Sequence, residues 1–111
     1  MSNLAENPVL DGLPGEELVR QGLIDLGAGT ESICALLVAI GYPRLHRMGV
    51  VSMPADRLPD DPEIQLYRLL QQQAPREAYP QYNSLIRRLV SFERALEHRQ
   101  RSRRKNPVAG V

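Results

Sequence analysis

The sequence predicts a mainly α domain, a compact bundle of four principal helices plus a short helical turn. The apolar residues are mostly aliphatic, with one Phe and no Trp, which suits helix-on-helix packing better than a sandwich or barrel. They recur at helical spacing in several segments, whereas the best strand-like stretch, residues 50–53, stands alone. At 111 residues the chain is one small domain. We expect a flexible N-terminal arm at 1–13, one helical domain at 14–98 and a basic, frayed extension at 99–111.

A first helix is predicted over residues 14–26. Pro14 suits a first helical turn, where its missing N–H is not needed, and apolar residues then recur at helical spacing as far as Leu26. Gly27 and Gly29 follow, and glycine readily takes the left-handed conformation that ends many helices. We expect the first helix to stop at these glycines.

A second helix is predicted over residues 30–40, with Thr30 as its N-cap. Residues 33–40 are apolar on every side, so this helix should be the most buried element. A buried strand is the alternative, because so short a run has no decisive periodicity. Residues 43–48 are expected to add one helical turn, closed by Gly49.

Two longer helices are predicted in the second half of the chain. One spans residues 62–73, because Asp60 or Asp61 can serve as its N-cap and Pro62 favours the first helical position. The other spans residues 81–103 and carries an apolar stripe along its first half.

The segment "LIDLGAGTE" contains a glycine motif formed by Asp25, Gly27 and Gly29. It resembles the first motif of the S-adenosylmethionine-dependent Rossmann-like methyltransferases, where the glycines let the backbone approach the cofactor. It is also similar to the phosphate loop of the actin and sugar-kinase ATPases. These resemblances imply S-adenosylmethionine or nucleotide binding at residues 25–30. However, Glu31 occupies the third small position, and no acidic residue follows about 20 positions later to hold a ribose. We interpret the segment as a joint between two helices and expect no cofactor.

Charge is distributed unevenly along the chain. Residues 1–86 hold 6 basic and 11 acidic residues, a net charge of −5, whereas residues 87–111 hold 8 basic and 2 acidic residues, a net charge of +6. The apolar stripe of the last helix ends at Leu96, so nothing is expected to anchor the basic end to a core. A protruding cationic helix gains phosphate contacts and releases counterions. The predicted macromolecule-binding residues are Arg94, Arg99, Arg101, Arg103, Arg104 and Lys105.

A second basic-aromatic group is suited to stacking on a base or gripping a phosphate. Its members are Tyr42, Arg44, His46 and Arg47. No catalytic residue or metal ligand is predicted, because the only two histidines lie in different elements and no metal-ligand spacing joins either of them to Cys34. Cys34 lies in an apolar run, which predicts a buried, inert thiol.

The sequence therefore favours a small, non-enzymatic, cytoplasmic protein that binds an anionic macromolecule, nucleic acid or an acidic protein, through its basic C-terminal helix. The alternative is an interaction or homodimer module that buries part of the apolar stripe at residues 85–96. The N-terminal residues lack the basic stretch followed by an apolar stretch that is typical of a signal peptide. The longest apolar run is too short to span a bilayer.

Overall fold

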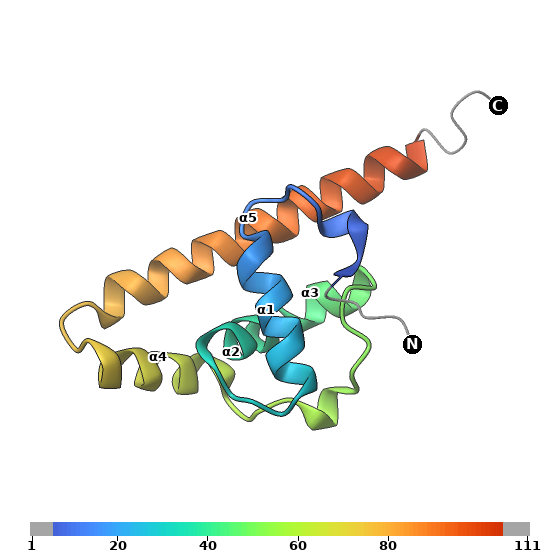
Figure 1. Cartoon of the computed structure of the whole chain (residues 1–111). Coiled ribbons are helices and arrows are strands. Elements are labelled where there is room, and N and C mark those ends of the chain that lie inside the picture. Colours follow the sequence, from blue (N-terminus) through green and yellow to red (C-terminus); the bar gives the residue numbers. More distant parts are fainter. Residues whose placement is uncertain (1–5, 106–111) are drawn as a thin grey trace.

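The computed structural model describes residues 6–105, and side chains within that range as far as residue 103. The fold is a mainly α bundle, as the sequence predicts, and no strand occurs within these residues (Figure 1). Two short 3-10 helices, η2 (Pro8–Leu10) and η3 (Ala55–Arg57), lie in the connecting segments. The α-helices of this range are α1 (Glu16–Gly27), α2 (Ile33–Ile40), α3 (Tyr42–Arg47), α4 (Pro62–Gln73) and α5 (Ala78–Lys105).

Helix α2 is the centre of the bundle, as its apolar sequence predicts. Residues 35–39 are all buried, and α1, α3, α4 and α5 each contact this helix. The alternative of a buried strand at residues 33–40 is therefore wrong. Residues 50–53 form no strand either, and Val50 and Val51 instead add buried side chains to the core.

Helices α1 and α2 approach each other closely at Gly22. A β-carbon built on Gly22 would lie 2.3 Å from the carbonyl oxygen of Cys34 and 2.4 Å from Cγ2 of Val38. Both atoms belong to α2, so the crossing requires a residue without a side chain.

The structure confirms the glycine joint between α1 and α2 and corrects its cap. Gly29 takes a left-handed φ of 76°, whereas Gly27 remains helical as the last residue of α1. Thr30 is not the N-cap of α2. Ser32 takes that position, and its Oγ accepts a hydrogen bond from the backbone N–H of Ala35 at 3.1 Å. The second helix is therefore shorter at its N-terminal end than the sequence predicts.

Part of the predicted flexible arm at residues 1–13 is packed onto the bundle. Leu10 and Leu13 are buried in the core, and the segment that carries them runs beside the C-terminal half of α5 (Figure 1). Two leucines outside any helical repeat give no periodic signal, so sequence periodicity does not reveal this packing. Residues 1–5 of the arm lie outside the described range.

Helices α3 and α4 match the sequence closely. Gly49 closes the turn after α3 with a φ of 80°, and α4 has the predicted bounds. Asp61 occupies the N-cap position of α4 with a left-handed φ of 45°, yet its side chain makes no capping hydrogen bond. Pro62, at the first helical position, starts this helix through its restricted φ and not through a side-chain cap.

Helix α5 runs along the whole bundle and forms a hairpin with α4 (Figure 1). It begins before the predicted start because Pro80 fits in a first helical turn, where its missing N–H needs no partner. Of the predicted frayed extension at 99–111, residues 99–105 are helical and the rest lie outside the described range. None of the helices in residues 6–105 is long and apolar enough to cross a membrane.

Candidate functional site

The outward side of α5 carries a row of exposed side chains that includes three arginines, which we call the basic stripe. Its members are Arg87, Ser91, Arg94, His98 and Arg101. All five are exposed, and their alternating spacing of four and three residues places them on one face of the helix. The two acidic residues of α5 lie off this line, since Glu93 is buried and Glu97 is half-buried. The stripe therefore presents arginine, histidine and serine side chains to solvent, and no carboxylate.

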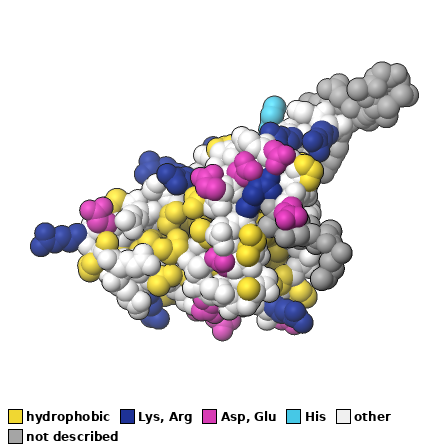
Figure 2. Space-filling model, viewed as in Figure 1, with side chains coloured by type: hydrophobic (Ala, Val, Ile, Leu, Met, Phe, Trp, Pro, Cys, Tyr) yellow, Lys and Arg dark blue, Asp and Glu magenta, His cyan; other side chains and the backbone are white. Residues whose placement is uncertain are grey.

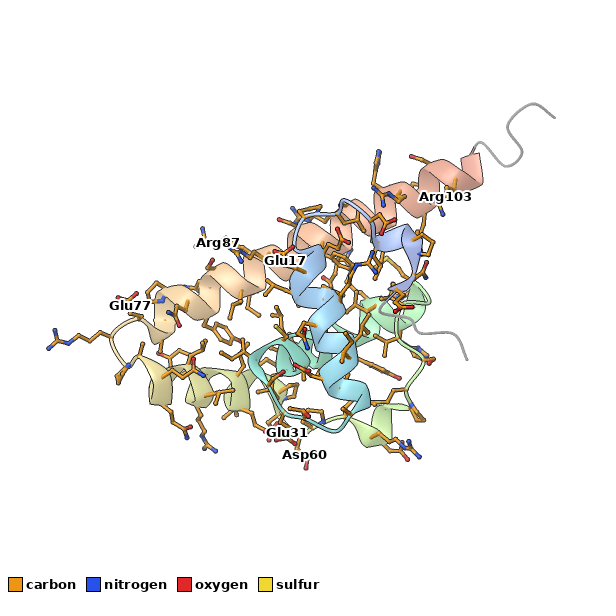
Figure 3. All side chains as sticks on the ribbon, in the orientation of Figure 1. Glu17, Glu31, Asp60, Glu77, Arg87 and Arg103 are labelled. Carbon is orange, nitrogen blue, oxygen red and sulfur yellow. The ribbon has the colours of Figure 1, made fainter. Side chains whose placement is uncertain are left out.

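The surface view agrees with this distribution. Dark-blue basic side chains gather in two groups along the upper part of the molecule, and magenta acidic side chains lie between and below these groups (Figure 2). Figure 3 labels Arg87 and Arg103 toward opposite ends of α5, with Glu17 beside the helix between them. Glu31 and Asp60 are at the opposite side of the molecule (Figure 3).

Arg99 does not belong to the free basic surface, although the sequence predicts it there. Its Nη1 donates hydrogen bonds to the backbone oxygens of Val9, at 2.8 Å, and Asp11, at 2.7 Å. On another side of the helix, Gln100 donates to the backbone oxygen of Met48 at 2.8 Å. The expectation that nothing anchors the basic end is therefore wrong, because two polar side chains tie it to the body of the protein.

The other predicted residues of this group differ in their surroundings. Arg94 and Arg103 are exposed, and Arg101 is exposed but lies 3.4 Å from a carboxylate oxygen of Glu97. An ion pair this open to solvent is worth little and leaves the guanidinium available. The side chains of Arg104 and the following lysine lie outside the described residues.

Arg44, from the second predicted group, points toward α5. Its guanidinium lies 3.5 Å from a carboxylate oxygen of Glu93 and 3.6 Å from one of Glu97. Glu93 is only 4% exposed, and burial raises the pKa of its carboxyl while the charge of Arg44 opposes that rise. The positive charge of Arg44 therefore offsets the negative charge of the buried Glu93 carboxylate.

Sequence reasoning missed the burial of Glu93, although a signal was present. Glu93 is four residues after Leu89 and three before Leu96, so it occupies the same helix face as two core leucines. An acid on that face needs a partner from another helix.

The rest of the second group does not converge on one point. The rings of Tyr42 and His46 lie 5.0 Å apart, and the hydroxyl of Tyr42 donates to the backbone oxygen of Met53 at 2.7 Å. His46 and Arg47 are exposed. Arg47 and Arg101 line the same small hollow between α3 and α5, and Arg44 and Arg101 both lie beside the carboxylate of Glu97, which also lines it.

A second hollow lies on the other side of α5, against the N-terminal segment. We call it the cationic groove, and it is lined by Leu13, Ala95, His98, Arg99, Ser102 and Arg103. None of these lining residues is acidic. The sequence gives no indication of the groove, because Leu13 is more than 80 positions from the α5 residues that line it, the first of which is Ala95.

The glycine motif lies in a setting unlike that of the methyltransferase motif that it resembles. Asp25 and Gly27 are part of α1, and no strand precedes them in the described residues. The carboxylate of Asp25 accepts hydrogen bonds from Ser32 Oγ at 2.6 Å and Gln21 Nε2 at 2.9 Å, and these bonds lower its pKa. In this protein, Asp25 therefore stabilises the joint between α1 and α2, whereas the resemblance implies that it would face a cofactor.

The cysteine and the predicted apolar stripe are partly or largely covered by other residues of this chain. Cys34 is half-buried, and partial burial raises the pKa of its thiol, with the charge of Asp25 adding to the rise. Of the predicted apolar stripe at residues 85–96, Leu89, Phe92 and Leu96 are buried in the core of this chain. The described residues contain no group of three or more His, Cys, Asp or Glu side chains placed to hold a metal ion.

Comparison of the chain with models of known families, with curated proteins and with solved structures found no match.

Proposed function

We propose that this protein is a non-enzymatic nucleic-acid-binding protein that contacts the phosphate backbone through the basic stripe of α5. The observation that carries the proposal is the composition of that stripe, which holds three arginines and a histidine and no acid on consecutive outward turns of one helix. From Arg87 to Arg101 the stripe extends about 21 Å at 1.5 Å per residue. A straight array of this length suits a regularly charged polymer.

The absence of apolar residues from the stripe favours nucleic acid over an acidic protein. Protein interfaces have a desolvated apolar or aromatic centre, with charges toward the rim. The five positions of the stripe are three arginines, a serine and a histidine. Binding to phosphates needs no apolar centre, because the release of condensed counterions drives it.

Two of the acidic residues support an orientation for this binding, although others, such as Glu17, lie beside α5 (Figure 3). Glu31 and Asp60 lie at the side of the molecule away from α5 (Figure 3). A duplex lying along the stripe therefore meets the basic side while these carboxylates face away from it, which also favours encounter in that orientation.

The test is the affinity for a 20-base-pair DNA duplex, measured by fluorescence anisotropy at 50 and 200 mM salt. The variant replaces Arg87, Arg94 and Arg101 with glutamine. Three phosphate contacts contribute a slope of about −2.7 in log K against log salt, equivalent to about 40-fold between the two salt concentrations. We expect the triple variant to lose that dependence together with most of the affinity at 50 mM salt.

The matched control replaces Arg57, Arg68 and Arg76 with glutamine. These three arginines are exposed and lie outside α5, so the control changes net charge by the same amount. It should retain most of the affinity. Absence of binding by the unmodified protein at 50 mM salt, or an equal loss in both triple variants, would refute the proposal.

A further inference from the structure

The guanidinium of Arg99 is held in place by the fold. Both hydrogens of Nη1 are directed to backbone oxygens, those of Val9 and Asp11, which belong to the N-terminal segment. Neither Nε nor Nη2 has a partner among the described residues. The two nitrogens form the side-on edge of the guanidinium, which presents two parallel N–H groups to a planar or tetrahedral anion.

Arg99 lines the cationic groove together with three other groups that can donate hydrogen bonds. These are the imidazole of His98, the hydroxyl of Ser102 and the guanidinium of Arg103. Leu13 and Ala95 supply an apolar wall. The groove thus combines a fixed two-pronged donor, further polar groups and a surface against which the uncharged part of a ligand can pack.

Glu16, an acid that Arg99 influences, is bonded mainly to groups outside the groove. The hydrogen bonds from Arg20 and from the backbone of Gly12 do most to lower the pKa of its carboxyl, and the charge of Arg99 adds to that lowering. The carboxylate of Glu16 accepts hydrogen bonds from Arg20 Nε at 2.7 Å and from the backbone N–H of Gly12 at 2.9 Å. Arg20 pairs with Glu16 and also with the carboxylate of Asp11, so both acids of this region have a partner that does not line the groove.

We infer that the cationic groove is a binding site for a phosphate group, held by the side-on edge of Arg99 and by Ser102, His98 and Arg103. Phosphate has oxygens enough to accept from several of these donors together, and arginine forks bind it in a bidentate manner. Because Nη1 is already fixed by two carbonyls, little side-chain freedom is lost on binding. The site differs from the basic stripe of the proposed function, because Arg87, Arg94 and Arg101 do not line the groove and only His98 belongs to both.

The test is a titration of the full chain with inorganic phosphate at constant ionic strength, with chloride as the balancing anion. Binding is followed by the NMR signals of the arginine Nε–H groups and by the thermal unfolding midpoint. We expect saturable binding that shifts the Nε–H signal of Arg99. A response that does not saturate, or that chloride reproduces, would overturn the inference.

The variants separate a specific site from general positive charge. Arg99→Lys keeps the charge and removes the fork, but it also breaks the tie to the N-terminal segment. Arg103→Gln is the cleaner change because Arg103 is exposed and forms no hydrogen bond or ion pair with the residues that the structure describes. We expect it to weaken phosphate binding about tenfold, the size of one charge-assisted hydrogen bond. Arg94→Gln, on the same helix but outside the groove, should leave it unchanged, and an equal loss in both would refute the site.

A competition measurement identifies the source of the phosphate and keeps this inference distinct from the proposed function. If inorganic phosphate displaces the DNA duplex and Arg103→Gln weakens duplex binding, the groove holds a backbone phosphate. If phosphate binds and the duplex is unaffected, the groove serves a small phosphorylated ligand. Duplex binding through the stripe with no saturable phosphate binding would leave the proposed function intact and overturn the site.

Discussion

Replacing Gly22 with alanine tests the packing at the centre of the bundle. The added β-carbon would lie 2.3 Å from the carbonyl oxygen of Cys34, where ordinary van der Waals contact begins at 3.4 Å. A backbone carbonyl cannot rotate away as a side chain can. Helices α1 and α2 would have to separate by about 1 Å, and the separation would loosen the packing around residues 35–39, which are buried on α2.

The expected cost follows from two opposing contributions. Overpacking a core costs about 1–3 kcal/mol, and a clash with backbone places this substitution at the upper end. Alanine is favoured over glycine inside a helix by about 1 kcal/mol. We therefore expect Gly22→Ala to lower the free energy of unfolding by about 2 kcal/mol.

Urea unfolding followed by the helical circular dichroism signal measures this change, which should lower the midpoint by about 1 M. Gly27→Ala is the matched control, because Gly27 lies in the same helix and a β-carbon there meets nothing within 4 Å. It should be neutral or stabilising by up to about 1 kcal/mol. If Gly22→Ala were as stable as the unmodified chain, or Gly27→Ala as unstable as Gly22→Ala, the close helix crossing would be refuted.

Three further predictions concern local features of the fold. Because burial raises the pKa of Glu93, the folded chain holds that proton more tightly than the unfolded chain. The free energy of unfolding should then fall as the pH rises from about 4.3 through the raised pKa. Urea unfolding across pH 4–8 measures this fall, which Glu93→Gln should lack. Equal pH profiles for the variant and the unmodified chain would contradict the prediction. Ser32→Ala removes the cap of α2 and should cost about 1 kcal/mol, whereas Thr30→Ala should change thermal stability by less than half of that; the reverse order would restore Thr30 as the cap. Asp61→Gly should raise the free energy of unfolding by up to about 1 kcal/mol, because glycine takes a left-handed φ without strain. A loss of stability in urea unfolding would show that the Asp61 side chain has a role.

The class of fold and the central helix could be predicted because they depend on local composition and spacing. Residues 33–40 are apolar on all sides, and only a position at the centre of a bundle can cover all of them. The start of α4 was predictable in the same way, since Pro62 restricts the backbone at its own position. These features need no knowledge of which segments meet in space.

The N-cap of α2 and the packing of the N-terminal segment could not be predicted from the sequence, because contacts between segments decided both. Thr30 and Ser32 are both acceptable N-caps by residue type. Ser32 also donates to Asp25 across the joint, a contact available only once α1 and α2 have packed. Leu10 and Leu13 are likewise buried because the bundle offers them a surface, and not because of a repeat in their own segment.

In the candidate site, too, some features could be predicted from the sequence and others depend on the tertiary structure. Helical spacing in the sequence by itself determined that Arg94 and Arg101 lie on the outward face of one helix, because a side chain's direction on a helix follows from its position in the repeat. Only the tertiary structure decided the use of Arg99, whose partners Val9 and Asp11 are about 90 residues away in the chain. A guanidinium makes the same five N–H groups available wherever it lies, and the carbonyls that the fold brings to it select which of them remain for a ligand.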